Sequence, residues 1–222
     1  MYNFTKEYGK TYSLETMKFN EFKKEFKNFI VFSLADIKKI DPDFWRARLN
    51  DWQKSGEIKK LRRGYYIFAD VDINENILFF IANKIYYPSY VSLESALSHY
   101  NLIPEAVCAI TSVSSKKTIS FQSPVGKFSY RRIRPALMFG YRLENINSHN
   151  CKIAEIEKTV LDYLYLNPNI ANENDFYEWR FRSREFLEQA NLEKWRQYCA
   201  AFQNKKFSER AQKLLKLINL SK

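Results

Sequence analysis

Residues 17–69 contain three short helical patterns followed by a hairpin pattern, and this order restricts the fold more than any other feature of the chain. In residues 17–30, phenylalanines recur at helical spacing with lysines between them, which predicts an amphipathic helix. Ser33 predicts the N-cap of a second helix, and Asp36 falls in its first turn, where a carboxylate suits the helix dipole. The first two helices are therefore predicted from local signals alone.

A third helix and a hairpin complete the pattern. Asp41 and Pro42 predict a helix start, and Gly56 predicts its end because glycine readily takes the left-handed conformation. Residues 58–68 then place aromatic and β-branched side chains on either side of a turn at Gly64, which predicts two short strands. Three helices and a basic hairpin in this order predict a winged helix-turn-helix over residues 15–70.

The remainder, residues 71–222, changes in texture and predicts a mixed α+β domain with a helical C-terminal third. We expect a helix at 76–86 packed on the wing, and another at 92–100 that is capped by Ser92 and ended by Asn101. Strands are expected at 107–113, 118–121, 128–133 and 136–141, and later helices include 185–202 and 209–220. The predicted fold class is thus α+β with two domains.

The charge of the chain favours a polyanionic partner. Lys and Arg number 36 against 25 Asp and Glu, so the formal net charge is +11. Such an excess suits nucleic acid, and a solvated basic surface is the alternative. Three dispersed cysteines, a charged N-terminus and short apolar runs predict a cytoplasmic protein with no membrane contact. No interface is readable, so the oligomeric state stays open.

The predicted third helix has a face suited to reading DNA. Trp45, Leu49 and Trp52 fall at helical spacing and are expected in the core. The opposite face offers Asp43, Arg46, Ala47, Asn50 and Lys54 to solvent. Arginine reads guanine and asparagine reads adenine through paired hydrogen bonds in the major groove. An ordinary amphipathic helix of mixed charge is the alternative.

The hairpin carries four cations and no acid between residues 58 and 69. They are Lys59, Lys60, Arg62 and Arg63. Cations on a thin hairpin beside a recognition helix suit phosphate contacts, which position a protein on DNA. Lysines on an exposed strand can also protect its edge from aggregation. Because helix pair, recognition helix and wing occur in order, we favour DNA contact.

A second basic tract lies in the strand-rich region. It comprises Lys116, Lys117, Lys127, Arg131, Arg132, Arg134 and Arg142, with no carboxylate between them. This surface could meet an acidic protein partner or extend a nucleic-acid footprint. Solvated strand faces are the alternative.

No catalytic residue, metal ligand set or cofactor motif is predicted. The one acidic cluster comprises Glu155, Glu157, Lys158 and Asp162. A metal-dependent nuclease would need such carboxylates to converge on an ion near a lysine. On a helix, however, Glu155 and Glu157 face different ways, while Lys158 and Asp162 form an i, i+4 pair. We therefore interpret the cluster as a network on a helix surface and the protein as a non-enzyme.

Four segments in order resemble the AbiEi-type antitoxins, the regulators of type IV toxin–antitoxin pairs. They are residues 62–66 (RRGYY), 90–97 (YVSLESAL) with Leu102 and Ile103, the strand region with Gly126, Tyr130 and Gly140, and 153–162 (IAEIEKTVLD). The resemblance covers residues 20–170. The family usually has proline where Ile156 stands and glycine where Asn101 stands, and the last fifty residues match no family pattern.

The resemblance implies a repressor that binds inverted repeats at its own promoter through the winged helix. It also implies a second domain that counters a partner toxin resembling nucleotidyltransferases. The DNA contacts that it implies are Arg46, Asn50, Lys54, Lys59, Lys60, Arg62 and Arg63. The expected partners are therefore operator DNA and a cognate toxin. There are two alternatives to this function. One is a protein-interaction module whose winged helix is structural, and the other is a metal-dependent nuclease.

Overall fold

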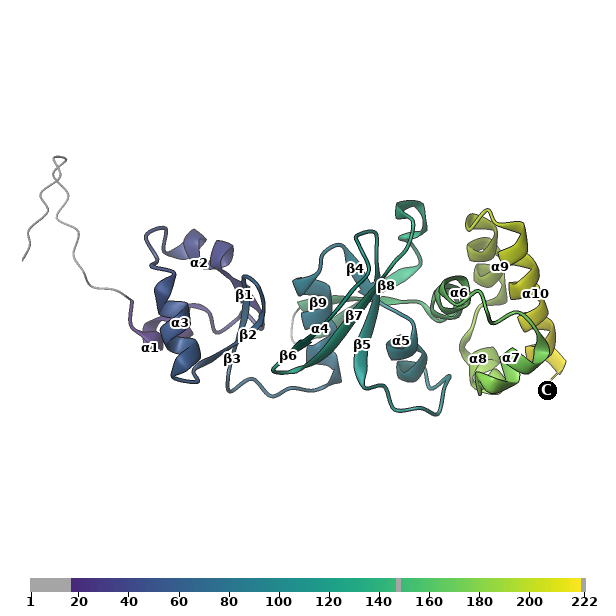
Figure 1. Ribbon diagram of the computed structural model, residues 1–222, viewed down its shortest axis with the longest axis horizontal. Helices are drawn as coiled ribbons and strands as arrows, with labels where there is room; N and C mark the ends of the chain where they lie inside the picture. Colours follow the sequence, from purple (N-terminus) through teal and green to yellow (C-terminus); the bar gives the residue numbers. More distant parts are fainter. Residues whose placement is uncertain (1–16, 147–148, 221–222) are drawn as a thin grey trace, which may run out of the picture.

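The computed structural model describes residues 17–146 and 149–220, which form an elongated molecule of mixed α+β structure (Figure 1). Helices and a small sheet near the N-terminus occupy one end. A larger sheet lies in the middle, and the C-terminal helices occupy the other end. The predicted α+β class is confirmed. No helix of the described residues has the length and apolar character needed to cross a bilayer.

The N-terminal unit, residues 17–70, alternates short helices with short strands. Its elements are α1 (Phe19–Glu25), β1 (Phe32–Ser33), α2 (Leu34–Ile40), α3 (Ala47–Lys54), β2 (Ile58–Arg62) and β3 (Tyr65–Phe68). The three strands form one antiparallel sheet in the order β1-β3-β2. Aromatic side chains fill its core: Phe22 contacts the rings of Phe26, Phe32 and Trp52 at centroid distances of 4.6–5.3 Å. This unit therefore has a core of its own.

Local signals at the ends of α2 and α3 are confirmed. The Ser33 hydroxyl accepts a hydrogen bond from the Asp36 backbone N–H, and the Asp36 carboxylate accepts one from the Ser33 N–H. This reciprocal capping box satisfies two backbone donors that a helix start would otherwise leave free. Gly56 follows α3 with φ +78°. The α1 helix is shorter than residues 17–30, because it ends at Glu25.

The predicted start of α3 is wrong. Asp41 ends α2, residues 42–46 form a turn and a short irregular segment, and α3 begins only at Ala47. Trp45 therefore lies outside the helix and does not share the spacing of Leu49 and Trp52. Trp45 is 66% exposed. Phe44 is buried instead and takes the place in the core that we expected Trp45 to fill.

A six-stranded mixed sheet forms the middle of the molecule. Its elements are α4 (Glu75–Ile85), β4 (Ser89–Val91), α5 (Glu94–His99), β5 (Ala109–Ser114), β6 (Ile119–Ser123), β7 (Gly126–Arg132), a 3-10 turn (Pro135–Leu137), β8 (Tyr141–Ile146) and β9 (His149–Ala154). The strand order is β6-β7-β5-β4-β9-β8, with parallel pairing of β5 to β7 and β4 to β9. Helix α4 lies on the side toward the N-terminal unit and α5 on the other (Figure 1).

Several expectations for this region are wrong. Residues 136–141 form the 3-10 turn and its exit, and the strand begins at Tyr141. Helix α4 packs chiefly on β9 and β4 of the six-stranded sheet, and its Ile85 carbonyl also accepts a hydrogen bond from Arg62 of the hairpin. Ser92 does not cap α5, since its hydroxyl donates to the Asp162 carboxylate 3.0 Å away. Asn101 does end α5 in the left-handed region, with φ +58°.

The C-terminal third is helical. It comprises α6 (Ile156–Leu166), α7 (Glu173–Glu178), α8 (Ser183–Gln189), α9 (Leu192–Ala201) and α10 (Lys205–Leu220). The single helix expected at 185–202 is two helices, because Asn191 caps α9 by accepting from the backbone N–H groups of Glu193 and Lys194. Helices α9 and α10 pack against α6, and α10 also packs against α7 and α8.

Candidate nucleic-acid interface

Helix α3 is held to the N-terminal unit by one apolar side and presents the other to solvent. Leu49 and Trp52 are buried, whereas Asn50 and Lys54 are exposed. Arg46, one turn before Asn50, is exposed at the N-cap position. These three side chains recur at every fourth residue, so they lie along one side of the helix. The predicted reading face of the helix is thus solvent-accessible.

Two other residues of this region lie differently from the reading face. Asp43 is exposed but belongs to the turn before α3, so the helix does not orient it. Arg48 is half-buried, and its guanidinium lies 5.1 Å from the ring centroid of Trp52. Arg48 therefore packs along the helix, while Arg46 and Lys54 take part in no ion pair of the described residues.

The hairpin forms as predicted, with Gly64 at its turn and φ +85°. A bulge between Lys60 and Arg62 shifts the register of β2 against β3. Lys60 and Arg63 are exposed near the turn. Lys59 is half-buried, and its ammonium donates to the Ala69 carbonyl oxygen 3.2 Å away. Two of the four hairpin cations are therefore fully available to a ligand.

Arg62, the fourth cation, turns toward the central sheet. Its guanidinium donates to the Ile85 carbonyl oxygen at 3.2 Å, at the C-terminal end of α4. It also lies 4.8 Å from the ring centroid of Tyr86 and 5.1 Å from that of Phe121. A guanidinium stacked between rings and bonded to a helix carbonyl is already engaged. Arg62 thus joins the hairpin to the central sheet.

The second basic tract divides into anchored and free cations. Arg131 donates to the Asn167 side-chain oxygen and the Leu166 carbonyl, and Arg134 donates to the Phe202 carbonyl. Arg142 pairs with Glu144. Lys116, Lys117, Lys127 and Arg132 are exposed. The tract is therefore not one set of free cations: Arg131, Arg134 and Arg142 are bonded to protein groups, although Arg134 and Arg142 are also exposed.

The sequence alone did not reveal a buried polar cluster that joins β4 to α6. Lys158 and Asp162, one turn apart on α6, form an ion pair with both side chains fully buried. The Tyr90 hydroxyl donates to the Asp162 carboxylate at 2.8 Å, and the Lys158 ammonium donates to the Tyr90 oxygen at 2.8 Å. With the Ser92 hydroxyl already described, the carboxylate has a partner on three sides. The expected i, i+4 pair forms, but its predicted position on a helix surface is wrong.

Burial governs the ionisation of this pair. Removal from water lowers the pKa of Lys158 and raises the pKa of Asp162, although their mutual attraction opposes both shifts. Gly140 closes the cluster: a Cβ there would lie 3.0 Å from the Tyr198 ring and 3.1 Å from the Lys158 Cγ. The ammonium and the carboxylate bond each other and buried hydroxyls, so the cluster serves to hold β4 on α6.

Glu155 and Glu157 do not converge on this pair. Glu155 accepts from the Tyr198 hydroxyl at 2.6 Å and from the Lys194 ammonium at 3.0 Å. Glu157 accepts from the Asn191 backbone N–H at 2.6 Å. Both carboxylates therefore fasten α9 to the start of α6. Within residues 17–146 and 149–220, no three His, Cys, Asp or Glu side chains are grouped as metal ligands would be.

Comparisons with known proteins leave the function to be argued from the molecule itself. No protein-family model matches the chain, and no curated protein matches it. The resemblance to AbiEi-type antitoxins therefore stays a prediction from sequence segments. The exposed side of α3 and the hairpin cations are the features on which a function can be built.

Proposed function

We propose that the protein is a sequence-specific DNA-binding repressor whose N-terminal unit is a winged helix-turn-helix. The observation that carries this proposal is the exposed row of Arg46, Asn50 and Lys54 on α3, within a unit whose hairpin carries free cations. Arginine and asparagine are the side chains that read base edges by paired hydrogen bonds. The helix order, the small antiparallel sheet and the basic hairpin support this proposal, because a winged helix combines elements of these kinds.

The division of labour between helix and hairpin follows from their side chains. Arg46 and Asn50 would read bases, because both can form two hydrogen bonds in one plane. Lys54, Lys60 and Arg63 would contact phosphates, where a point charge is enough. Arg62 is left out of this set because its guanidinium is bonded and stacked against the central sheet.

The proposal is tested by titrating the protein against a labelled DNA duplex from directly upstream of its gene. An unrelated duplex is titrated in parallel, and both are measured at several salt concentrations. The variant is Lys60→Ala/Arg63→Ala. The control is Lys24→Ala/Lys27→Ala, which removes two exposed charges of the same unit, one from α1 and one from the turn after it. We expect the first variant alone to weaken binding and to reduce the salt slope by about 2, since each phosphate contact contributes about 0.9. Equal affinity for both duplexes, unchanged by the hairpin variant, would overturn the proposal.

We extend the proposal to antitoxin activity on the strength of the sequence resemblance. In that role the protein autoregulates its operon, and its second domain counters a toxin resembling nucleotidyltransferases. Co-expression of the chain with the gene next to its own tests this role. We expect the neighbouring gene to arrest growth. Co-expression of the full chain should relieve the arrest through residues 71–222, whereas the hairpin alone should not relieve it. A neighbour without effect on growth would remove the antitoxin role and leave the repressor.

An exposed aromatic favours one alternative function, a protein-interaction module. Trp45 is 66% exposed directly before α3, and Ile40 is 43% exposed at the end of α2. Exposed tryptophan is enriched in protein interfaces. If the N-terminal unit binds protein, Trp45→Ala abolishes that binding while duplex DNA binds weakly and without sequence preference. The upstream-DNA titration separates the two functions.

A further inference from the structure

A basic groove lies at the C-terminal end of the molecule, between the end of α6 and the side of α10. Its volume is about 890 Å³. Four cations line it, namely Arg132, Lys206, Arg210 and Lys213, against one acid, Glu209. Of the described residues, none forms an ion pair with any of these four cations. The groove therefore has a positive charge that its own walls do not neutralise.

The spacing of the cations gives the groove a direction. Lys206, Arg210 and Lys213 occur at i, i+4 and i+7 of α10, so they form one stripe along the helix. Lys206 and Lys213 are separated by about 10 Å at a rise of about 1.5 Å per residue. A stripe of this length suits an extended chain of anions better than a single small anion.

Arg210 is the half-buried cation of the groove. Its guanidinium donates to the carbonyl oxygens of Leu164, Asn167 and Ile170 at 2.9–3.1 Å, where α6 ends. Arg210 is half-buried, and the partial loss of hydration lowers its pKa. An anion in the groove would restore the lost stabilisation. The other three cations, Arg132, Lys206 and Lys213, are exposed.

An aromatic ring stands beside the cations. Tyr165 lines the groove and is half-buried, and its ring is held by Phe202 and Phe207 at centroid distances of 5.1 Å and 5.6 Å. Single-stranded nucleic acids are bound by positively charged grooves with aromatic rings on which bases stack. An acidic peptide would need the cations but not the ring.

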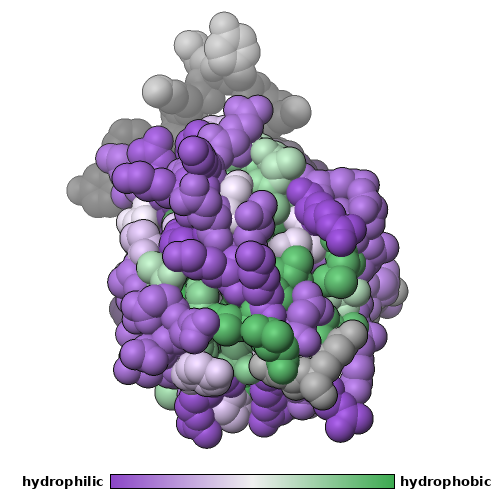
Figure 2. All heavy atoms as spheres, turned by 90° about the vertical axis from the view of Figure 1, so that its right-hand side faces the viewer, coloured by the Kyte–Doolittle hydropathy of each residue, from purple (hydrophilic) through white to green (hydrophobic). Residues whose placement is uncertain are grey.

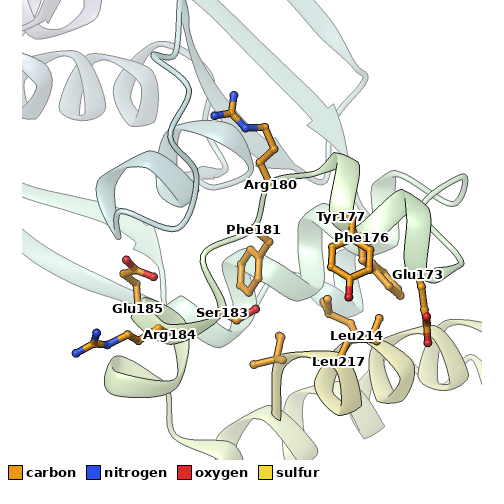
Figure 3. Close-up of a pocket in the computed structure, with 11 residues that line it drawn as sticks. Glu173, Phe176, Tyr177, Arg180, Phe181, Ser183, Arg184, Glu185, Leu214 and Leu217 are labelled. Atoms are coloured by element: carbon orange, nitrogen blue, oxygen red, sulfur yellow. The ribbon is translucent and has the colours of Figure 1, made fainter. Parts of the chain in front are cut away.

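A second pocket at the same end shows the contrast. It has a volume of about 430 Å³ and lies between α7, α8 and α10 (Figure 3). Figure 2 shows apolar side chains gathered on this end of the molecule and surrounded by hydrophilic ones. The arginines at the pocket, Arg180 and Arg184, are paired with Glu105 and Glu188. That pocket has no excess of free cations, so it offers an anion no comparable attraction.

We infer that the groove between α6 and α10 binds a strand of single-stranded nucleic acid. Arg132, Lys206 and Lys213 contact its phosphates, and Tyr165 stacks on a base. This function is separate from the proposed binding of duplex DNA, because the groove and the N-terminal unit lie at opposite ends of the molecule (Figure 1).

Fluorescence anisotropy with labelled 12-nucleotide oligo(dT) and oligo(U) tests the inference on the full chain. All proteins carry Lys60→Ala/Arg63→Ala, so that the hairpin does not contribute. The groove variant is Arg132→Ala/Lys206→Ala/Lys213→Ala. Its matched control, Arg184→Ala/Arg196→Ala/Lys216→Ala, removes three exposed charges from the same helical third outside the groove. Arg210 is left intact because it holds the end of α6.

We expect the groove variant alone to bind weakly, with a salt slope smaller by about 2, since each phosphate contact of a single strand contributes about 0.7. Tyr165→Leu should weaken binding about tenfold without changing the slope, and Tyr165→Phe should bind like the parent protein. Comparison of oligo(dT) with oligo(U) assigns the strand to DNA or RNA.

Two results would overturn the inference. One is equal binding by the groove variant and its matched control. The other is a pair of observations: Tyr165→Leu binds the oligonucleotide normally, and polyglutamate displaces the oligonucleotide from it. That result would assign the groove to an acidic protein. Thermal unfolding of each variant shows that the fold is intact. The duplex titration described above is independent, so failure of one function leaves the other standing.

Discussion

The guanidinium of Arg62 stacks over the ring of Tyr86 at 4.8 Å, and this contact fastens the hairpin of the N-terminal unit to the central sheet. The apolar side chains of the hairpin are buried on both of its faces, although Lys60 and Arg63 are exposed. Tyr66 and Phe68 belong to the aromatic core of the N-terminal unit, whereas Leu61 and Ile67 belong to the larger core of the central sheet. A hairpin packed on two cores cannot change its position without disturbing both.

Arg62→Ala should therefore lower the stability of the chain rather than the number of its phosphate contacts. The loss of one charged hydrogen bond and of stacking on two rings corresponds to about 1–3 kcal/mol. Urea unfolding measures the loss, and the salt slope of duplex binding should stay at the wild-type value. Arg62→Lys keeps the charge but not the planar stack, so it should be nearly as unstable. A salt slope that falls by one unit in Arg62→Ala would instead make Arg62 a phosphate ligand.

Asn50→Ala should reduce the preference for upstream DNA without a comparable loss of affinity for unrelated DNA. One bidentate contact to a base contributes about 1–3 kcal/mol of discrimination. Lys54→Ala, on the same side of α3, should weaken binding to both duplexes equally because a phosphate contact has no sequence preference. The ratio of the two dissociation constants checks the prediction. A ratio unchanged in Asn50→Ala would exclude this side of α3 as the reading face.

Lys158→Met should be strongly destabilising, by about 3–5 kcal/mol, because it leaves the Asp162 carboxylate buried without its counter-ion. The double variant Lys158→Met/Asp162→Leu should lose less than the sum of the two single variants. Lys194→Met, which breaks a partly exposed pair with Glu155, serves as the control and should cost less than about 1 kcal/mol. If the loss of stability in the double variant equalled the sum of the losses in the two single variants, Lys158 and Asp162 would not be energetically coupled.

Glu155 predicts a pH dependence of stability. Burial raises the pKa of this carboxyl, but hydrogen bonds from Tyr198 and Lys194 outweigh burial and bring the pKa below its ordinary 4.5. A carboxyl whose pKa is lowered by folding stabilises the fold above the unfolded pKa and loses this contribution as pH falls through the folded pKa. Melting temperatures of wild type and Glu155→Gln should thus differ most above about pH 5 and converge in acid. The exposed Glu188→Gln should show a smaller difference, and a constant gap at every pH would contradict the assignment.

Gly140→Ala should destabilise the chain more than Gly56→Ala. Both glycines have positive φ, +66° and +78°, so both substitutions carry a similar backbone strain. Only the Cβ at residue 140 would also press on Tyr198 and Lys158, at 3.0 Å and 3.1 Å, while nothing lies within 4 Å of the Cβ at residue 56. The difference between the two unfolding free energies isolates this overpacking, which commonly amounts to about 1–3 kcal/mol. Equal losses of unfolding free energy in the two variants would show that Tyr198 and Lys158 move aside without an energetic penalty.

Local chemistry explains which expectations hold. The cap formed by Ser33 and Asp36 needs only residues three apart, and the hairpin turn needs only Gly64, so both could be predicted from the sequence. The start of α3 could not, because the signals at Asp41 and Pro42 suit the turn that actually forms as well as a helix start. Short-range rules do not distinguish a turn from a helix start at these residues. The burial of Phe44 in the core favours the turn.

Long-range partners explain the rest. The spacing of Lys158 and Asp162 predicts a pair, but their burial depends on Tyr90, which lies 68 and 72 residues away in the chain. Arg62 meets Ile85 across 23 residues, and no pattern within the hairpin reports that contact. The basic stripe of α10 did have a signal, the i, i+4, i+7 spacing of Lys206, Arg210 and Lys213, and helical periodicity alone would have found it.

The elongated shape of the molecule has a consequence for any pair of ligands bound at its two ends. The N-terminal unit and the C-terminal helices are separated by the whole central sheet, so a ligand on one end leaves the other uncovered (Figure 1). Occupancy of one end then does not compete with occupancy of the other. A duplex held at α3 and a strand held at α10 would be tethered to the same chain, each raising the local concentration of the other as a bivalent linker does.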